Sequence, residues 1–176
     1  FSSLTNVIPL PTYEWPDYTR NLDQALSQVR SHDWLICDLA CNSWEAVQSY
    51  YTESVFGKES EAFFLEHRKK LVGKTGLKQD DFNPLDGWKD WSFIKKLMRA
   101  FETKLTLRPR CHILCCNTAN ALDEKNDPKT LLEMYRGFGA KPAGFKKFDH
   151  GVHTVFGMSQ TCPGDYKLAT CKDRVR

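Results

Sequence analysis

The residues Trp34-Leu-Ile-Cys-Asp-Leu-Ala40 form an apolar run that a single carboxylate, Asp38, interrupts. Continuous apolar runs of this length are typical of parallel strands that are covered on both faces. Asn42 or Ser43 then begins a predicted helix, so Asp38 falls near the carboxyl end of the strand. Open α/β sheets bind their ligands at this end of their strands. We therefore predict a buried strand over residues 34–40 with an acidic group at a ligand-binding edge.

A second apolar run, Cys111-His-Ile-Leu-Cys-Cys-Asn-Thr118, predicts another buried strand that ends in polar residues. Two interpretations of Asn117 and Thr118 are open. Polar side chains at a strand end can contact a γ-phosphate or the water that attacks it. They can equally well close a turn.

The remaining apolar spacing predicts helices that alternate with strands and then give way to a hairpin. Strands over residues 153–158 and 166–171 are joined by a turn through Pro163 and Gly164. We expect one α/β domain over residues 1–176, with a largely parallel sheet flanked by helices and a C-terminal β-hairpin. The predicted helices cover residues 20–31, the segment after Asn42, and residues 59–72, 88–105 and 129–136.

Composition excludes several classes of protein. With 41% hydrophobic and 27% charged residues, the chain is neither disordered nor collagen-like. It contains no apolar run of the ~18–20 residues that span a bilayer and no signal peptide, which predicts a soluble, intracellular protein without a membrane partner.

The seven cysteines are an odd number and predict free thiols in a reducing compartment. A zinc site is the weaker alternative, from Cys37, Cys41, Cys111 and Cys115 or from His150 and His153.

Positive charge is concentrated in the second part of the chain. The net charge is +3, but residues 1–60 are acidic overall and residues 61–176 are basic overall. The basic residues predict contact with phosphates, either of a nucleic-acid backbone or at a neighbouring subunit. A solvated basic surface and an exposed charged tail are the alternatives. The candidate residues are Lys141, Lys146, Lys147, Lys172, Arg174 and Arg176.

An apolar strand that ends in an aspartate also occurs at the Walker B position of P-loop nucleotidases, where the carboxylate binds Mg²⁺. The tripeptide Gly73-Lys74-Thr75 is not the matching Walker A motif. That motif needs a glycine at the position of Arg68 and a strand before the loop. We therefore expect the loop that cradles the phosphates to lie outside the 176 residues or to have been lost.

From about residue 30 onward, the order of these segments resembles the RecA-like, AAA-type nucleotide-binding proteins of tailed phages. The segments that carry the resemblance are 33–38, Trp44 to Gly57, 112–118, 138–144, 153–156 and 169–176. The resemblance implies a P-loop core that binds ATP and Mg²⁺ and acts in phage DNA metabolism, such as recombination or strand handling. It also implies a homo-oligomer in the cytoplasm of the infected host cell.

Residue by residue, the resemblance implies that Asp38 is the Walker B ligand of Mg²⁺. Asn117 would be a sensor-like catalytic residue, with Thr118 beside it at the nucleotide. Lys172, Arg174 and Arg176 would form a basic end that reaches DNA or a neighbouring nucleotide. The chain departs from the pattern where many such ATPases have a catalytic glutamate, because Leu39 follows Asp38. The chain alone is therefore expected not to hydrolyse ATP.

Two other classes of function remain open at this stage. One is a non-enzymatic viral α/β interaction or structural module with a vestigial nucleotide site, and the other is a nucleic-acid-binding protein that uses no nucleotide. The RecA-like interpretation predicts that strands 34–39 and 112–117 are parallel in one sheet. It further predicts either a vacancy beside residues 112–117, filled by polypeptide outside this chain, or direct pairing of residues 153–158 with 112–117.

Overall fold

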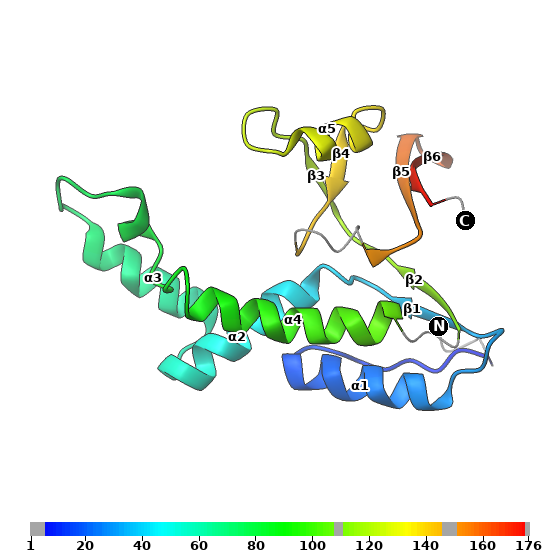
Figure 1. Ribbon diagram of the computed structural model, residues 1–176, viewed down its shortest axis with the longest axis horizontal. Helices are drawn as coiled ribbons and strands as arrows, with labels where there is room; N and C mark the ends of the chain where they lie inside the picture. Colours follow the sequence, from blue (N-terminus) through cyan, green and yellow to red (C-terminus); the bar gives the residue numbers. More distant parts are fainter. Residues whose placement is uncertain (1–5, 108–110, 146–150, 175–176) are drawn as a thin grey trace. The chain divides into compact units, whose positions relative to one another are not determined.

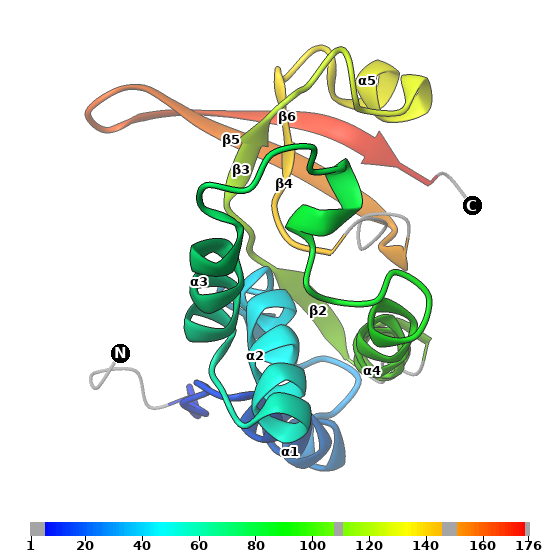
Figure 2. The same cartoon turned by 90° about the vertical axis from the view of Figure 1, so that its left-hand side faces the viewer.

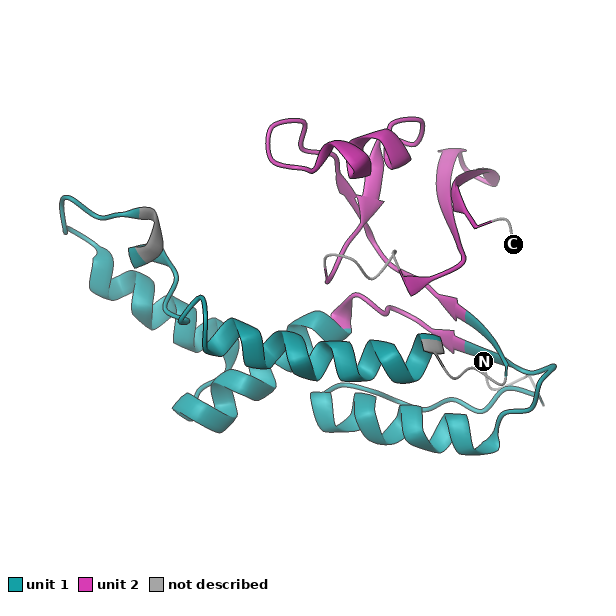
Figure 3. Ribbon diagram, in the orientation of Figure 1, with its two compact units in different colours: residues 1–35, 43–113 teal, residues 36–42, 114–176 magenta. Residues whose placement is uncertain are grey.

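The computed structural model describes residues 6–107, 111–145 and 151–174 (Figure 1). The chain divides into two compact units (Figure 3). Unit 1 comprises residues 1–35 and 43–113, and unit 2 comprises residues 36–42 and 114–176. In the described parts of the chain, no helix is both long enough and apolar enough to cross a membrane.

Unit 1 is mainly helical. Its first helix begins with a capping box, in which the side chain of Glu14 accepts the backbone N–H of Asp17 and the side chain of Asp17 accepts the backbone N–H of Glu14. Pro16 fits this first turn because its φ is fixed near the helical value. The elements are α1 (Trp15–Gln28), α2 (Asn42–Phe56), α3 (Ser60–Leu71), the 3₁₀ helix η1 (Gln79–Phe82) and α4 (Asp90–Leu107).

The core of unit 1 follows the apolar stripe of α4. Ile94, Met98, Phe101 and Leu105 recur every three or four residues and are all buried. The ring of Trp15 in α1 lies 5.6 Å from that of Phe101, so the two helices share this core. The helix predicted over residues 88–105 is therefore confirmed as α4, and its apolar stripe forms the core of unit 1.

Strands β1 (Trp34–Cys37) and β2 (His112–Cys115) pair in parallel. The N–H of His112 donates to the carbonyl of Asp33 at 3.0 Å, and the N–H of Cys116 donates to that of Cys37 at 2.9 Å. Both strands advance by four residues in the same direction between these bonds, as a parallel pair requires.

The prediction that these strands are buried on both faces is wrong. Alternate residues along each strand are exposed, and the exposed fraction is 62% for Trp34 and 60% for Ile36. The residues between them along each strand are only half-buried. The continuous apolar run therefore reflects a strand pair with one open face.

Unit 2 contains the other strands and one helix, α5 (Lys129–Tyr135). Strands β3 (Ala119–Ala121) and β4 (Ala140–Pro142) pair antiparallel, and so do β5 (Thr154–Cys162) and β6 (Asp165–Asp173). Figure 2 shows β5 and β6 as a long two-stranded ribbon. The sequence did not predict β3 or β4, because three-residue strands are too short to show an alternation of polar and apolar residues.

The mixed α/β composition and the C-terminal hairpin are confirmed. Among the described strands, however, only β1 and β2 pair in parallel, so a largely parallel sheet is not confirmed. Strands β2 and β5 belong to separate sheets, and the alternative in which residues 153–158 pair with 112–117 is wrong. Strand β5 instead pairs with β6, the next strand in the sequence. Closing this short turn costs less chain entropy than closing the longer loop between β2 and β5 would.

Candidate functional site

The carboxyl ends of β1 and β2 bring three of the predicted site residues to one edge. Backbone pairing continues past the strands, because the N–H of Ala40 donates to the carbonyl of Cys116 at 2.8 Å. This bond holds the turn after Asp38 against the segment that leads to Asn117 and Thr118. The side chain of Asp38 is exposed and that of Asn117 is half-buried. We call Asp38, Cys41, Cys116, Asn117 and Thr118 the strand-end site.

A thiol and a hydroxyl connect the two sides of this site. The Sγ of Cys41 lies 3.6 Å from the Oγ1 of Thr118, within hydrogen-bond distance for sulfur. No sequence pattern pairs these residues, which lie 77 positions apart. The contact fixes Thr118 at the end of the turn that carries Asp38.

Residues 143 and 144 close this turn from a second direction. The N–H of Ala143 donates to the carbonyl of Thr118 at 2.8 Å. Gly144 has a φ of +97°, and a Cβ atom at this position would lie 3.0 Å from the Cα of Cys41. Position 144 therefore requires glycine for two reasons, the positive φ of its backbone and its close approach to Cys41. The sequence pattern alone reveals neither requirement, since both depend on a tertiary contact.

Three thiols near the site have shifted pKa values, of which two are raised and one is lowered. Burial, followed by the negative charges of Asp38 and Cys37, raises the pKa of Cys116. A hydrogen bond to Cys37 and then burial raise the pKa of Cys115, while the same hydrogen bond lowers the pKa of Cys37. The side chain of Asp38 itself is exposed at this edge.

The oxygen donors of the site suit a magnesium ion. Asp38 offers a carboxylate, Asn117 an amide oxygen and Thr118 a hydroxyl, and Mg²⁺ prefers such hard ligands. Proteins usually hold Mg²⁺ through one or two carboxylates together with water and the phosphates of the substrate. No cluster of three or more His, Cys, Asp or Glu side chains that could hold a metal is present among the described residues. A metal at Asp38 would therefore need phosphate oxygens to complete its ligands.

The basic candidates that the structure describes, Lys141, Lys172 and Arg174, lie in β4 and at the end of β6 in unit 2. Lys141 in β4 forms an ion pair with Asp127, and this contact is the main cause that lowers the pKa of Asp127. The Nζ of Lys172 in β6 donates to the carbonyl of Val152 at 2.9 Å. The N–H of Arg174 donates to the carbonyl of His153 at 3.0 Å. Lys146, Lys147 and Arg176, like His150 in the alternative zinc site, lie outside the described residues.

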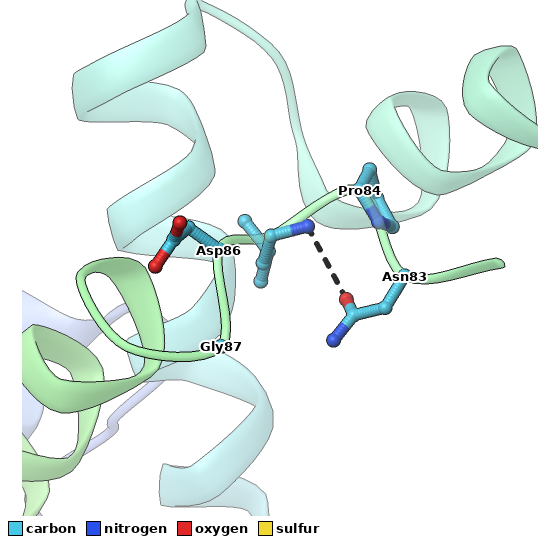
Figure 4. A pocket seen from close by; sticks show the side chains of 5 residues that line it. Asn83, Pro84, Asp86 and Gly87 are labelled. Carbon is cyan, nitrogen blue, oxygen red and sulfur yellow. Dashed lines mark hydrogen bonds between the residues drawn. The ribbon is translucent and has the colours of Figure 1, made fainter. Parts of the chain in front are cut away.

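A pocket in unit 1 contains none of the predicted site residues (Figure 4). Its polar groups serve the loop before α4. The carboxylate of Asp86 accepts hydrogen bonds from the N–H groups of Trp88 and Lys89, which lowers its pKa. The side-chain oxygen of Asn83 accepts the N–H of Leu85, as the dashed line shows. The pocket therefore shows the capping of a helix rather than a reactive centre.

The chain matches no protein-family model, no curated protein and no solved structure. The functional argument therefore rests on the residues of the strand-end site and on their geometry.

Proposed function

We propose that the strand-end site is the magnesium side of an ATP site, in a phage RecA-like P-loop ATPase that acts on DNA. The observation that supports this proposal is the parallel pairing of β1 and β2. It places an exposed aspartate at the end of one strand beside Asn117 and Thr118 at the end of the next. Parallel strands present their carboxyl ends to ligands in this way.

Each residue has a distinct part in this proposal. Asp38 would hold Mg²⁺ directly or through water, and the bound ion would neutralise charge on the phosphates. The amide of Asn117 would hydrogen-bond to the γ-phosphate or orient the attacking water, and the hydroxyl of Thr118 would lie beside it. The backbone that cradles the phosphates is not encoded in these 176 residues. The chain alone should therefore bind ATP weakly and should not hydrolyse it.

Binding of Mn²⁺, as a substitute for Mg²⁺, tests the proposal on the chain as it is. The water-proton relaxation rate of Mn²⁺·ATP would be measured during titration with the protein, because this rate changes when the protein binds the complex. We expect Asp38→Asn to weaken Mn²⁺·ATP binding at least ~5-fold, because it removes the one charged ligand. Glu124→Gln is the matched control, since Glu124 is an exposed carboxylate elsewhere in unit 2.

Two results would reject the proposal. One is wild-type protein that takes up no Mn²⁺·ATP at millimolar concentration, which would favour a non-enzymatic interaction module. The other is equal uptake by the wild type and Asp38→Asn, which would remove Asp38 from the site.

DNA is the proposed macromolecular partner. The support is the basic balance of residues 61–176, with Lys172 and Arg174 at the end of the hairpin. Such residues would contact the phosphate backbone without reading its sequence.

A further inference from the structure

The hairpin of β5 and β6 has two faces of different character. Opposite residues in an antiparallel pair project to the same side. Three successive pairs, each two residues apart, therefore share one face, which we call the apolar hairpin face. It consists of Phe156 opposite Thr170, Met158 opposite Leu168, and Gln160 opposite Tyr166.

The other face of the hairpin is contacted by the rest of unit 2 at Gly157. Gly157, between Phe156 and Met158, is buried, and a Cβ atom on it would lie 2.6 Å from the ring of Phe138. Lys167 lies opposite Ser159, and Lys172 lies opposite Val155, so both lysines also belong to this second face. Phe138 thus packs on the second face at Gly157, whereas all six residues of the apolar hairpin face are exposed.

The open face exposes large apolar side chains. The exposed fraction is 56% for Phe156, 60% for Tyr166, and 67% for both Met158 and Leu168. None of the six residues of the face is charged. Aromatic residues and methionine without charge are characteristic of the cores of protein–protein interfaces. A nucleic acid would need cations on this face, whereas the lysines of the hairpin lie on the opposite one.

The area of the face fits one half of an ordinary interface. Large side chains bury about 150–250 Å² each, so at these exposed fractions the four offer about 400–600 Å² per copy. A standard interface buries about 800 Å² per partner, of which about 450–520 Å² is non-polar. The apolar hairpin face therefore supplies the non-polar area that a stable dimer needs.

The pattern on the face is also complementary to itself. The two aromatic rings occupy one diagonal, the polar Gln160 and Thr170 occupy the other, and Met158 and Leu168 lie between them. A two-fold axis in the plane of the face, along or across the strands, places each ring over a smaller polar side chain of the second copy. Alternation of large and small side chains allows two layers to interdigitate. We propose that a second copy of this chain covers the apolar hairpin face, in an isologous hairpin-on-hairpin dimer.

Sedimentation velocity in reducing buffer, between about 1 and 100 µM protein, tests this dimer. We expect the mass to rise to twice that of the 20.3 kDa chain with concentration. Met158→Glu and Leu168→Glu should each raise the dissociation constant at least ~10-fold, because each buries a charge at the centre of the interface. Ser159→Glu is the matched control, as it adds the same charge to the neighbouring residue on the opposite face. Circular dichroism melts confirm that every variant is folded.

A mixing experiment identifies the partner as a second copy. Leu168→Glu and Leu168→Lys chains should each be monomeric and should associate when mixed. Opposite charges then lie over each other if the two-fold axis runs across the strands, and one strand apart at the centre of the face if it runs along them. The proposal is overturned if the wild type is monomeric at every concentration, if Ser159→Glu has the same effect as Met158→Glu, or if mixing restores nothing. A monomer that binds single-stranded DNA through Phe156 and Tyr166 would also overturn it. None of these results depends on the proposed nucleotide site.

Discussion

Glu102 in α4 has a partly buried carboxylate. Its Oε1 atom is buried and has no hydrogen-bond partner among the described residues. Burial raises the pKa of Glu102 to about 7, although Arg99 opposes this shift. A buried acid of this kind favours its protonated form. Glu102 is therefore a point at which pH acts on the stability of unit 1.

The sign of the pH effect follows from the two states. Because the ordinary pKa of the group is 4.5, the folded chain binds more protons than the unfolded chain between about pH 4.5 and 7. Stability should fall as the pH rises through this window. Glu102→Gln removes the loss, so its melting temperature relative to the wild type should increase by a few degrees between pH 5 and 8. Thermal melts at each pH measure this difference, with the exposed Glu124→Gln as control. A difference that stays constant with pH would contradict the prediction.

Individual residues differ in how far the sequence predicts their position. Asp38, Asn117 and Thr118 could be placed at strand ends because an apolar run marks each strand directly before them. Cys41 and Gly144 could not be placed beside them. Their contact joins segments far apart in the chain, and no periodicity records it.

At the scale of elements, helical spacing predicted α3 and α4 to within two residues at either end. Helix α1 begins earlier than expected, at Trp15, because the capping box of Glu14 and Asp17 and the proline between them start it five residues before the first predicted helical residue. An apolar run does not reveal whether one or both faces of its strand are covered. The exposure of Trp34 and Ile36 could therefore not be predicted.

The packing of the hairpin on its neighbours depends on the lack of a side chain at Gly157. Gly157→Ala would force the Phe138 ring or the β5 backbone to move, and should destabilise the protein by about 1–3 kcal/mol. Urea unfolding measures this loss. Gly137→Ala, next to Phe138 but with nothing within 4 Å of the added carbon, should change stability by less than about 0.5 kcal/mol. Equal stability of the two variants would show that Phe138 does not pack on β5.

At the scale of the whole molecule, the proposed DNA partner requires that binding depend on particular basic residues rather than on net charge. Reversal of Arg174 and Arg176 to glutamate should weaken binding to any DNA sequence. It should also reduce the salt slope by about 0.7–0.9 for each lost phosphate contact. Reversal of Lys95 and Lys96, exposed on α4, changes the total charge equally and is the control. Fluorescence anisotropy over a series of salt concentrations measures both slopes, and identical slopes for the two variants would contradict the prediction.

The arrangement of the sheets is the part of the molecule that the sequence predicts least well. Alternating helices and strands indicate a mixed α/β chain, and this much is confirmed. Whether strands pair in one sheet or in several is decided by contacts between distant segments. Strand β5 has the same apolar character whether it pairs with β6 alone or lies inside a larger sheet. The RecA-like arrangement accordingly remains a proposal.

The parallel pairing of β1 with β2 also governs the order in which the chain can fold. Thr118 and Cys41, just beyond the two strands, are 77 residues apart, and closing a loop of that length costs about 4 kcal/mol of chain entropy. The helices between the strands form from local contacts and need no such closure. We therefore expect α2 and α4 to form early and the strand pair to form late. Until it forms, Trp34, Ile36 and Leu114 stand on unpaired strands, so aggregation during refolding should begin there.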